Sequence, residues 1–357
     1  MKLLKLFLLL LTLTGWAQTV IFPGQSGQEL LDNLVITYKP ATVLSYNDAR
    51  DLMFGTLNNV NDSVACFYTD YKVYIDPNST LAPRTQAYNA GLDTEHSWPQ
   101  SLGATGNARS DIHHLFPTRT YVNSARGNLP YGEIDDVLTD RWYYLSLVTT
   151  TIPGANIDEY SELDLDVRFE VREDHKGNIA RALFYFYTMY EDQADPTFFT
   201  VQKNVLRQWS FLDPVDGEEL TRTNQIAAVQ DNKPNPFVLD TTLIGRAFFG
   251  VSTALNGQSG DHPAAAFTLH PNYPNPFNPQ TVITFELAKA GMVDLSIFDT
   301  AGRKIRTLIA GTVSPGQHQA VWDGKDSHGR AAASGIYLYR LQSEDAMPAA
   351  RKMLLVR

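Results

Sequence analysis

The chain has 357 residues, which is more than one typical domain and predicts two or three. An apolar fraction of 43% excludes global disorder, because it supplies enough side chains for packed cores. The formal net charge is −10, with an uneven distribution. Residues 18–266 carry 17 basic against 32 acidic side chains, a net of −15, whereas residues 267–357 carry 10 against 7. The longer region therefore lacks the basic footprint that is usual for nucleic-acid binders.

Residues 1–17 have the pattern of a cleaved signal peptide. Lys2 and Lys5 precede a short apolar run, residues 6–14, that cannot span a bilayer. Gly15 and Ala17 then place small residues where a signal peptidase cuts, so we expect cleavage after Ala17 and export across a bacterial inner membrane. An uncleaved anchor is the alternative. No later run has the length and apolarity of a membrane helix, so we expect no transmembrane segment after cleavage.

Cys66 is the single cysteine, so no intramolecular disulfide can form. It stands within an apolar run, residues 64–68. We therefore expect a small buried side chain and not a reactive thiol.

Residues 18–250 have the mixed pattern of one α+β domain. The spacing predicts helices at 29–35 and 46–54, the second capped by Ser45 or Asn47. Residues 64–74 are rich in β-branched and aromatic side chains and predict one or two strands. Further helices are expected at 179–190, 201–211 and 225–230, the first of them apolar nearly all round and hence buried.

The composition changes after residue 250. Residues 251–266 are small and polar, which is typical of a linker. Residues 267–357 then contain short alternating segments separated by glycines that we expect at turns: Gly302, Gly311, Gly316, Gly324 and Gly329. The segments are residues 281–287, 293–298, 319–322 and 335–341. This pattern predicts a small β-sandwich.

The densest potential chemistry lies in residues 93–128. Glu95 and Asn123 offer a carboxylate and a carbonyl oxygen, which suit a hard cation such as Mg²⁺, with Mn²⁺ or Ca²⁺ as alternatives. His96 has an unperturbed pKa of about 6.5 and suits the removal of a proton from water at neutral pH. Arg126 and Arg109 are the candidates for contacting a phosphate. Together these groups can hold a metal ion, activate water and neutralise a phosphate.

A short helix is expected at residues 118–126, because Pro117 suits a first turn and Gly127 a C-terminal cap. On such a helix Arg119, Asn123 and Arg126 share one face. The carboxamide of Asn123 would then lie between two guanidinium groups.

Some residues of this segment have alternative assignments. His113 and His114 are candidates for packing or for orienting the site, with direct metal binding as the less favoured role. Asn128 competes with Asn123 as a ligand, although it lies beyond the expected helix end. Arg119 could equally form a surface salt bridge, and Asp111 is expected to hydrogen-bond the backbone or an arginine nearby.

These motifs resemble the active site of the bacterial endonuclease I family, which is of the ββα-metal (His-Me finger) type. The resemblance covers roughly residues 27–245 and rests on motifs that occur in the family's order: Glu95-His96, residues 111–117, residues 123–128, residues 176–181, Trp209 with Asp213-Pro214, and residues 235–237. It implies an α+β nuclease domain in which His96 is the general base and Glu95 and Asn123 bind magnesium. It also implies cleavage of DNA, and often of RNA, with little sequence preference.

Two features depart from that family. Thr94 stands where the family commonly has an arginine, which removes one potential phosphate contact. Secreted relatives often contain disulfides, and this chain cannot form one within itself.

Residues 267–357 resemble the immunoglobulin-like C-terminal domains that direct proteins to the type IX secretion system. The resemblance rests on residues 267–279, 291–306 and 334–340, and on the basic end at 352–357. It implies the type IX machinery as a partner and a secreted or outer-membrane surface location, with the periplasm as the alternative. A sandwich that stays attached as a binding module is the other interpretation.

The sequence thus predicts four parts: a signal peptide (1–17), a catalytic domain (18–250), a linker (251–266) and a β-sandwich sorting domain (267–357). The predicted activity is metal-dependent endonucleolytic cleavage of DNA, and alternatively RNA, by a monomer. Two other hypotheses stay open, namely an inactive surface or adhesion protein and a phosphodiesterase of smaller substrates.

Overall fold

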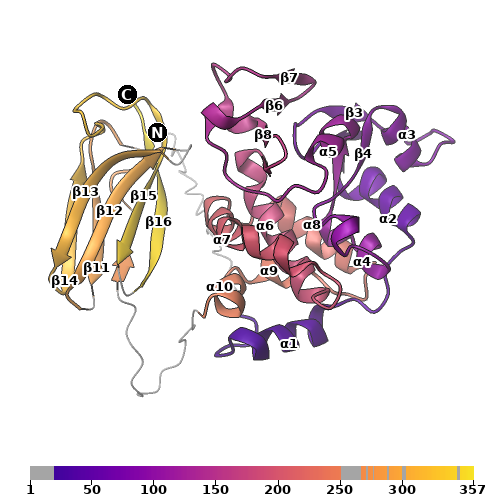
Figure 1. Ribbon diagram of the computed structural model, residues 1–357, viewed down its shortest axis with the longest axis horizontal. Coiled ribbons are helices and arrows are strands. Elements are labelled where there is room, and N and C mark those ends of the chain that lie inside the picture. Colours follow the sequence, from indigo (N-terminus) through magenta and orange to yellow (C-terminus); the bar gives the residue numbers. More distant parts are fainter. Residues whose placement is uncertain are drawn as a thin grey trace, which may run out of the picture. The chain divides into compact units, whose positions relative to one another are not determined.

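The computed structural model describes residues 20–250 and 267–357, apart from residues 271, 276, 288, 300–302 and 344–345. The chain divides into two compact units, residues 1–255 and 256–357 (Figure 1). The expected signal peptide and linker lie outside the described residues. No helix within the described ranges combines the length and apolarity that a membrane crossing requires.

The first unit is a mixed α/β domain. Its helices are α1 Gly27–Tyr38, α2 Tyr46–Leu52, α3 Pro83–Asn89, α4 Asn107–Ser110, α5 Thr120–Arg126, α6 Lys176–Met189, α7 Pro196–Leu212, α8 Gly217–Ala227, α9 Pro236–Leu239 and α10 Leu243–Phe248. Its strands form three antiparallel sheets, ordered β1-β2-β3, β4-β5 and β7-β6-β8-β9. Their bounds are β1 Asn59–Val60, β2 Ser63–Ala65, β3 Lys72–Tyr74, β4 Leu92–His96, β5 Leu115–Arg119, β6 Arg141–Tyr144, β7 Leu147–Thr149, β8 Ser161–Asp164 and β9 Arg168–Glu170.

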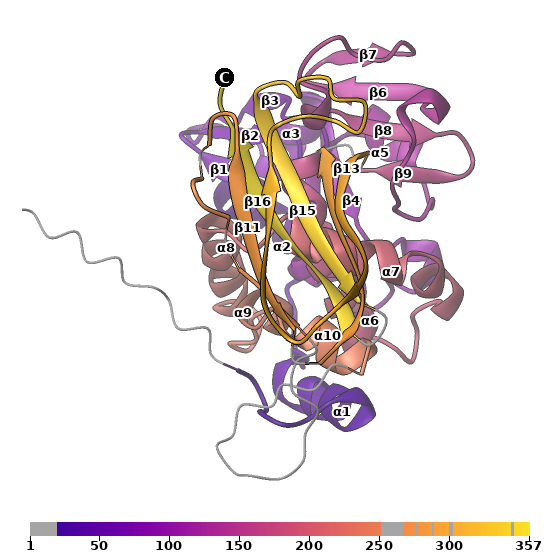
Figure 2. The same cartoon turned by 90° about the vertical axis from the view of Figure 1, so that its left-hand side faces the viewer.

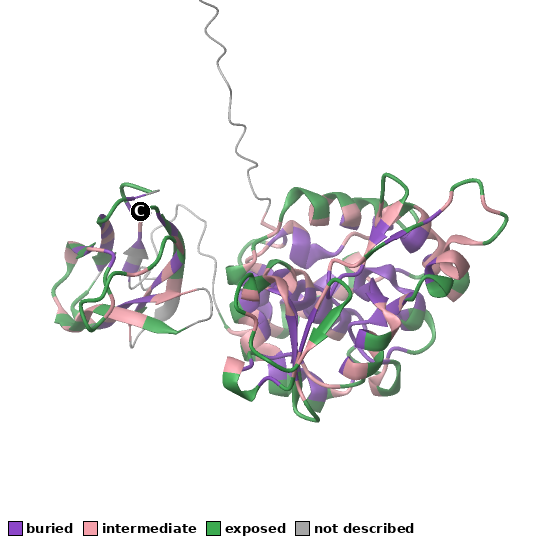
Figure 3. Cartoon of the chain, turned by 90° about the horizontal axis from the view of Figure 1, so that it is seen from above, coloured by how far each residue is buried: buried purple, intermediate pink, exposed green. Residues whose placement is uncertain are grey.

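The core of this unit is built around α6. As its all-round apolar pattern predicts, nearly every residue of α6 is buried, and α7 packs along it. Trp98 stacks on Phe186 of α6 with ring centroids 4.7 Å apart. Buried residues fill the interior, and exposed ones lie on loops and outer helix faces (Figure 3). This core fixes the elements that carry the polar site.

The helix at α2 begins as predicted, with the Ser45 hydroxyl accepting from the backbone N–H of Asp48 at 3.2 Å. It continues into a π-helical turn, Met53–Leu57, whose first two residues are buried. The expected helix at 225–230 is instead the end of α8, which runs from Gly217 to Ala227.

The segment around Pro117 differs from the sequence expectation. Residues 115–119 form strand β5, and the helix begins only at Thr120, so Pro117 does not start it. The carbonyl of Pro117 accepts from Phe67 N–H at 2.8 Å, on the side away from β4. Backbone N and O of one strand residue point to the same side, so the missing N–H of Pro117 costs the β4–β5 ladder nothing.

The second unit is a β-sandwich, as predicted. Its sheets are ordered β10-β11-β14 and β13-β12-β15-β16, and their strands run roughly alongside one another in Figure 2. The bounds are β10 Phe267–Leu269, β11 Thr281–Leu287, β12 Gly291–Asp299, β13 Lys304–Val313, β14 Gly316–Trp322, β15 Gly335–Ser343 and β16 Ala346–Leu355. Inward-facing residues such as Phe285, Leu295 and Trp322 form a core of their own. Strand β13 was not predicted, and Gly311 lies within it and not at a turn.

Candidate active site

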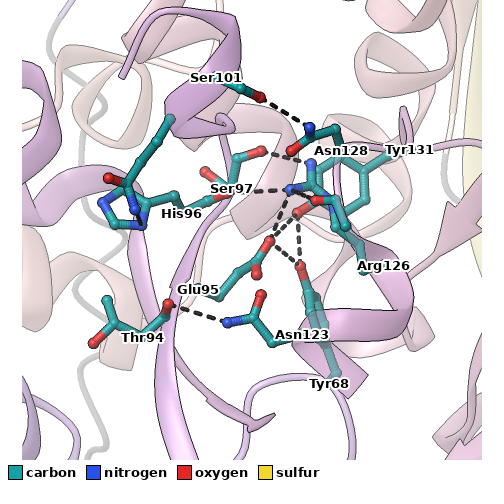
Figure 4. A network of polar contacts seen from close by, with 12 residues as sticks. Tyr68, Thr94, Glu95, His96, Ser97, Ser101, Asn123, Arg126, Asn128 and Tyr131 are labelled. Atoms are coloured by element: carbon teal, nitrogen blue, oxygen red, sulfur yellow. Dashed lines mark hydrogen bonds and ion pairs between the residues drawn. The ribbon is translucent and has the colours of Figure 1, made fainter. Parts of the chain in front are cut away.

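Strands β4 and β5 and helix α5 bring the candidate residues together (Figure 4). Thr94 pairs with Pro117 across the ladder, and because this pair exchanges no backbone hydrogen bond, the Thr94 carbonyl points away from β5. Helix α5 follows β5 directly and returns beside that free edge. There Asn123 Nδ2 donates to the Thr94 carbonyl at 3.2 Å. This bond fixes the carboxamide and turns Oδ1 toward Glu95 in Figure 4.

The Glu95 carboxylate is buried, with 1% of the residue exposed. Its contacts end on one oxygen: Oε1 accepts from the hydroxyls of Tyr68 (2.8 Å) and Tyr131 (3.4 Å) and pairs with Arg126 Nη1 at 3.0 Å. Within the described part of the chain, no hydrogen bond ends on Oε2. Burial raises the pKa of Glu95, and the guanidinium of Arg126 opposes that shift.

Arg126 occupies a different position from the one expected for a phosphate contact. Its side chain is 1% exposed, and besides Glu95 it donates to the carbonyls of His96 (3.2 Å), Ser97 (2.9 Å) and Gly127 (3.2 Å). Its guanidinium also lies 4.6 Å from the Tyr131 ring centre. The phosphate role assigned to Arg126 from the sequence therefore needs correction, because the side chain turns inward and holds Glu95 to the end of β4.

His96 is held in one tautomer by its neighbours. Its Nε2 lies 3.0 Å from the carbonyl of Arg109, which can only accept, so in the neutral ring Nε2 carries the proton. Nδ1 then holds the lone pair, 3.4 Å from the Gln100 side-chain nitrogen. Burial, followed by the neighbouring His114, lowers the pKa of His96 to about 3. The imidazole is therefore neutral, with an available base nitrogen, at neutral pH.

The side chains of Glu95 and His96 leave the end of β4 in different directions (Figure 4). This follows from the alternation of side chains along a strand. A substrate group in contact with both must therefore lie across the strand end.

Arg109 lies beside His96 with its side chain exposed. Its guanidinium carbon is 4.2 Å from the ring centre of Tyr46, and that ring stacks on His96 with centroids 5.5 Å apart. Among the described residues, no carboxylate forms an ion pair with Arg109. The structure thus leaves this arginine available to an anion next to the imidazole.

A second arginine approaches the strand from α2. Arg50 Nε donates to the Thr94 hydroxyl at 3.0 Å, and Nη2 pairs with Asp93 at 2.8 Å. The family commonly has an arginine at position 94, and in this chain the guanidinium of Arg50 lies beside that position instead. No local spacing signals Arg50 and Tyr46, because they lie more than 40 residues before β4.

The alternative ligands take structural roles. His113 Nε2 lies 2.9 Å from the Lys233 carbonyl and His114 Nε2 lies 2.7 Å from the Ala108 carbonyl, and both imidazoles are buried. Asn128 donates to the Ser101 hydroxyl at 2.8 Å. Asp111 bonds the backbone N–H of His113 at 3.1 Å, as expected. It also accepts from three distant side chains that the sequence did not indicate, Tyr185, Tyr190 and Gln230.

The donor set fits a hard divalent cation. Oε2 of Glu95 and Oδ1 of Asn123 are oxygen atoms held by their other contacts, and Mg²⁺ commonly takes one or two protein oxygens while keeping several waters. Within the described ranges, no three His, Cys, Asp or Glu side chains converge as a metal site. A cation here would therefore rest on one carboxylate and one carboxamide.

The mixed fold and this polar site define a nuclease domain, and the comparisons with known proteins identify its family. The chain belongs to the endonuclease I family, whose model, described as Endonuclease I, matches residues 27–242. Extracellular ribonucleases of Bacillus subtilis (strain 168) and Bacillus amyloliquefaciens are 29% and 30% identical to it. Each alignment covers 60% of this chain and 72% of the relative.

The second unit matches a different family. The FlgD Ig-like domain model covers residues 275–346. Among solved structures, dimeric latent PorU from Porphyromonas gingivalis is similar over 26% of this chain and 10% of its own, with 20% identity and a TM-score of 0.23. FlgD from P. aeruginosa is similar over 21% of this chain and 60% of its own, with 23% identity and a TM-score of 0.19.

Proposed function

We propose that the protein is a secreted, metal-dependent endonuclease that hydrolyses phosphodiester bonds with little sequence preference. The observation that carries this proposal is an unprotonated His96 Nδ1 at the end of β4 together with Glu95 Oε2 and Asn123 Oδ1, two oxygens that accept no hydrogen bond from the described residues. Family membership supports the same reaction class.

His96 is the proposed general base. Its Nε2–H stays bonded to the Arg109 carbonyl, so Nδ1 takes the proton from the attacking water as the new P–O bond forms. Gln100, 3.4 Å from Nδ1, would orient the ring or the water before transfer. The bond to the 3′ oxygen breaks, and that oxygen receives a proton from solvent.

Glu95 and Asn123 are the proposed metal ligands. A bound Mg²⁺ would supply charge stabilisation for the phosphate and the leaving 3′ oxygen. The tyrosines and Arg126 keep Oε1 of Glu95 occupied, so Oε2 is the oxygen that remains for the cation. Arg126 is a positioning residue in this proposal, and Arg109 contacts the phosphate.

Both DNA and RNA are proposed substrates. Two relatives are named extracellular ribonucleases, which favours RNA. Attack by water needs no 2′-hydroxyl, so the same residues serve DNA. The small number of contacts to the reacting phosphate agrees with low sequence preference, since phosphate contacts carry no base information.

For the second unit we propose a sorting role. Its sandwich fold and its own core agree with a module that the type IX secretion machinery recognises, with release or surface attachment as the result. This assignment rests on the sequence resemblance of residues 267–357. The catalytic unit is proposed to act as a monomer.

The first experiment is nicking of supercoiled plasmid, and digestion of RNA, by residues 18–357 with Mg²⁺ and with EDTA. His96→Ala should lower the rate by about 10²–10⁴-fold while leaving the circular dichroism spectrum unchanged. Asn123→Ala should raise the Mg²⁺ concentration needed for half-maximal rate, whereas Asn128→Ala, five residues along the chain, should not.

Each alternative has its own result. A folded protein that cleaves neither polymer would favour an inactive surface protein. Hydrolysis of small diesters without nicking of closed circles would favour a phosphodiesterase. Cleavage that survives EDTA would remove the metal from the proposal.

A further inference from the structure

Arg119 is the last residue of β5, where it pairs with Leu92 of β4, and helix α5 begins at the next residue. Its guanidinium carbon is 5.0 Å from the ring centre of Tyr71, and Nη1 donates to the Leu145 carbonyl at 3.2 Å. One hydrogen bond uses only one of the five N–H groups of an arginine. The ring and the carbonyl thus hold the guanidinium while most of its donors remain available.

Arg119 lacks the ion pair that neutralises other arginines around the site. Arg50 pairs with Asp93, Arg84 with Asp51 and Arg126 with Glu95. For Arg119, no carboxylate lies within ion-pair distance in the part of the chain that the structure describes. In a domain with a net charge of −15, a half-exposed arginine without a partner is available for an external anion.

The environment of Arg119 repeats that of Arg109. Each guanidinium lies over a tyrosine ring, Tyr71 in one case and Tyr46 in the other. Arg109 adjoins the base His96, whereas Arg119 directly precedes α5, the helix that carries the metal-ligand candidate Asn123. The two arginines therefore border the site at its two proposed functional groups.

A further exposed pair extends the surface beyond Arg119. Tyr121 is 49% exposed, and its hydroxyl accepts from Arg141 Nη1 at 3.3 Å. Tyr121 follows Arg119 by two residues, and Arg141 lies on β6, whose hairpin with β7 also supplies the Leu145 carbonyl. Aromatic rings beside unneutralised arginines are the groups that bind single-stranded nucleic acid.

We propose that Arg119, held on Tyr71, forms a second phosphate-binding subsite, which takes the phosphodiester next to the one being cleaved. This inference rests on the proposed nuclease function. A strand whose scissile phosphate faces Arg109 and Asn123 would then place a neighbouring phosphate at Arg119. The ligand class is the sugar–phosphate backbone of DNA or RNA, read without regard to sequence.

Arg119→Gln tests the subsite in the full-length protein, with Arg168→Gln as the matched control. Arg168 is an exposed arginine that donates to a single backbone carbonyl, Glu133 O, at the same 3.2 Å. It lies on β9, at the opposite edge of the sheet whose β6–β7 hairpin contacts Arg119. Both variants remove one positive charge, so a general electrostatic effect would be alike in the two.

We expect Arg119→Gln to raise the KM for a single-stranded oligonucleotide about tenfold, with kcat within about twofold of wild type. The slope of log KM against log salt concentration should decrease by about 0.7, which is the change expected for one lost phosphate contact on a single strand. Arg119→Lys should recover part of the KM, and Arg168→Gln should match the wild type.

Two results would overturn the subsite. One is a KM and salt dependence for Arg119→Gln equal to those of Arg168→Gln; the other is a fall in kcat at unchanged KM. Both comparisons use an active wild-type enzyme. Failure of the proposed function would instead appear as no cleavage by the wild type.

Discussion

The Glu95–Arg126 pair illustrates how burial decides a residue's role. A short sequence motif offered Arg126 as a phosphate ligand, but the side chain points inward and makes one ion pair and three carbonyl contacts. A buried carboxylate needs a partner, and the tyrosines alone supply no positive charge. The local sequence does not reveal whether the Arg126 side chain points inward or outward, because its spacing of three residues from Asn123 is the same in both cases.

Arg126→Met should lower the free energy of unfolding by about 3–5 kcal/mol, since it leaves the Glu95 carboxylate buried without a countercharge. Urea denaturation monitored by tryptophan fluorescence measures the change. The double variant Glu95→Gln/Arg126→Met should lose much less, because no uncompensated charge remains. A normal stability combined with a raised KM would instead return Arg126 to the role of phosphate ligand.

Glu162 supplies a prediction about pH. It is buried on β8, where the Thr139 hydroxyl donates to it at 2.5 Å, and burial raises its pKa to about 8. The folded state therefore binds this proton more tightly than the unfolded chain, whose pKa is near the ordinary 4.5. The stabilising contribution is complete below pH 4.5 and is lost as the pH rises through about 8.

Glu162→Gln should consequently flatten the decline in stability between pH 5 and 8.5, by at most about 1.4 kcal/mol per pH unit, and should be the more stable protein at the alkaline end. Chemical denaturation at the two pH values provides the measurement, with the exposed Glu218→Gln as control. Parallel pH profiles for the Glu162 variant and the wild type would contradict the assignment.

At the level of elements, the sequence predicted the longer apolar helices but not the short helices α3, α4, α9 and α10, and it predicted the elements that carry the site only in part. Strong apolar periodicity located α1, α6 and α7, whose faces pack in the core. The helix expected at 118–126 begins two residues later, at Thr120, because Pro117 belongs to strand β5. Pro117 pairs there with Thr94 at a position that requires no N–H donor toward β4. The pairing of β5 with β4 and the hydrogen bond from Phe67 N–H to the Pro117 carbonyl decide this point, and neither long-range contact leaves a signal in the local sequence pattern.

The same limit applies to the site. Glu95, His96 and Asn123 could be proposed from motifs, whereas no motif indicated Tyr68 and Tyr131. These tyrosines reach Glu95 from 27 and 36 residues away. Long-range contacts of this kind depend on how the sheets assemble and have no spacing that a single sequence can display.

Helix α2 makes a testable contribution through Tyr46. Its ring lies under Arg109 and against His96, so Tyr46→Leu should lower kcat/KM, and Tyr46→Phe, which keeps the ring, should not. In a double-mutant cycle with Arg109→Gln, the two losses should fall short of additivity by about 0.5–1 kcal/mol. Fully additive losses would show that Tyr46 does not position Arg109.

At the scale of the whole molecule, the acidic charge is unevenly placed along the catalytic unit. Residues 133–174 contain 12 acidic and 3 basic side chains, whereas residues 93–128 contain 3 of each. Three of the acids, Glu133, Glu170 and Glu173, pair with the buried Lys176 at 3.0, 2.7 and 2.5 Å. The segment that carries the site is therefore neutral within a domain of −15, which makes binding of a polyanion compatible with the overall charge.

The two units have separate cores, which predicts that they act independently. Removal of residues 267–357 should leave kcat/KM for plasmid cleavage within about twofold of the full-length protein, because all candidate site residues belong to the first unit. It should also abolish export in the native host. A large loss of purified activity would mean that the sandwich takes part in substrate binding.

Cys66 lies 1% exposed beneath the junction of β5 and α5, where its sulfur accepts from Arg119 N–H at 3.2 Å and lies 3.5 Å from the Thr118 hydroxyl. Since it is the single cysteine in the chain, modification of the native protein by a thiol reagent can occur only when this junction opens. The rate of labelling, compared with that of the unfolded chain, thus gives the free energy of local opening. The protein contains its own probe of how firmly the strand and helix that carry Asn123 are held, and of whether a divalent cation or an oligonucleotide tightens them.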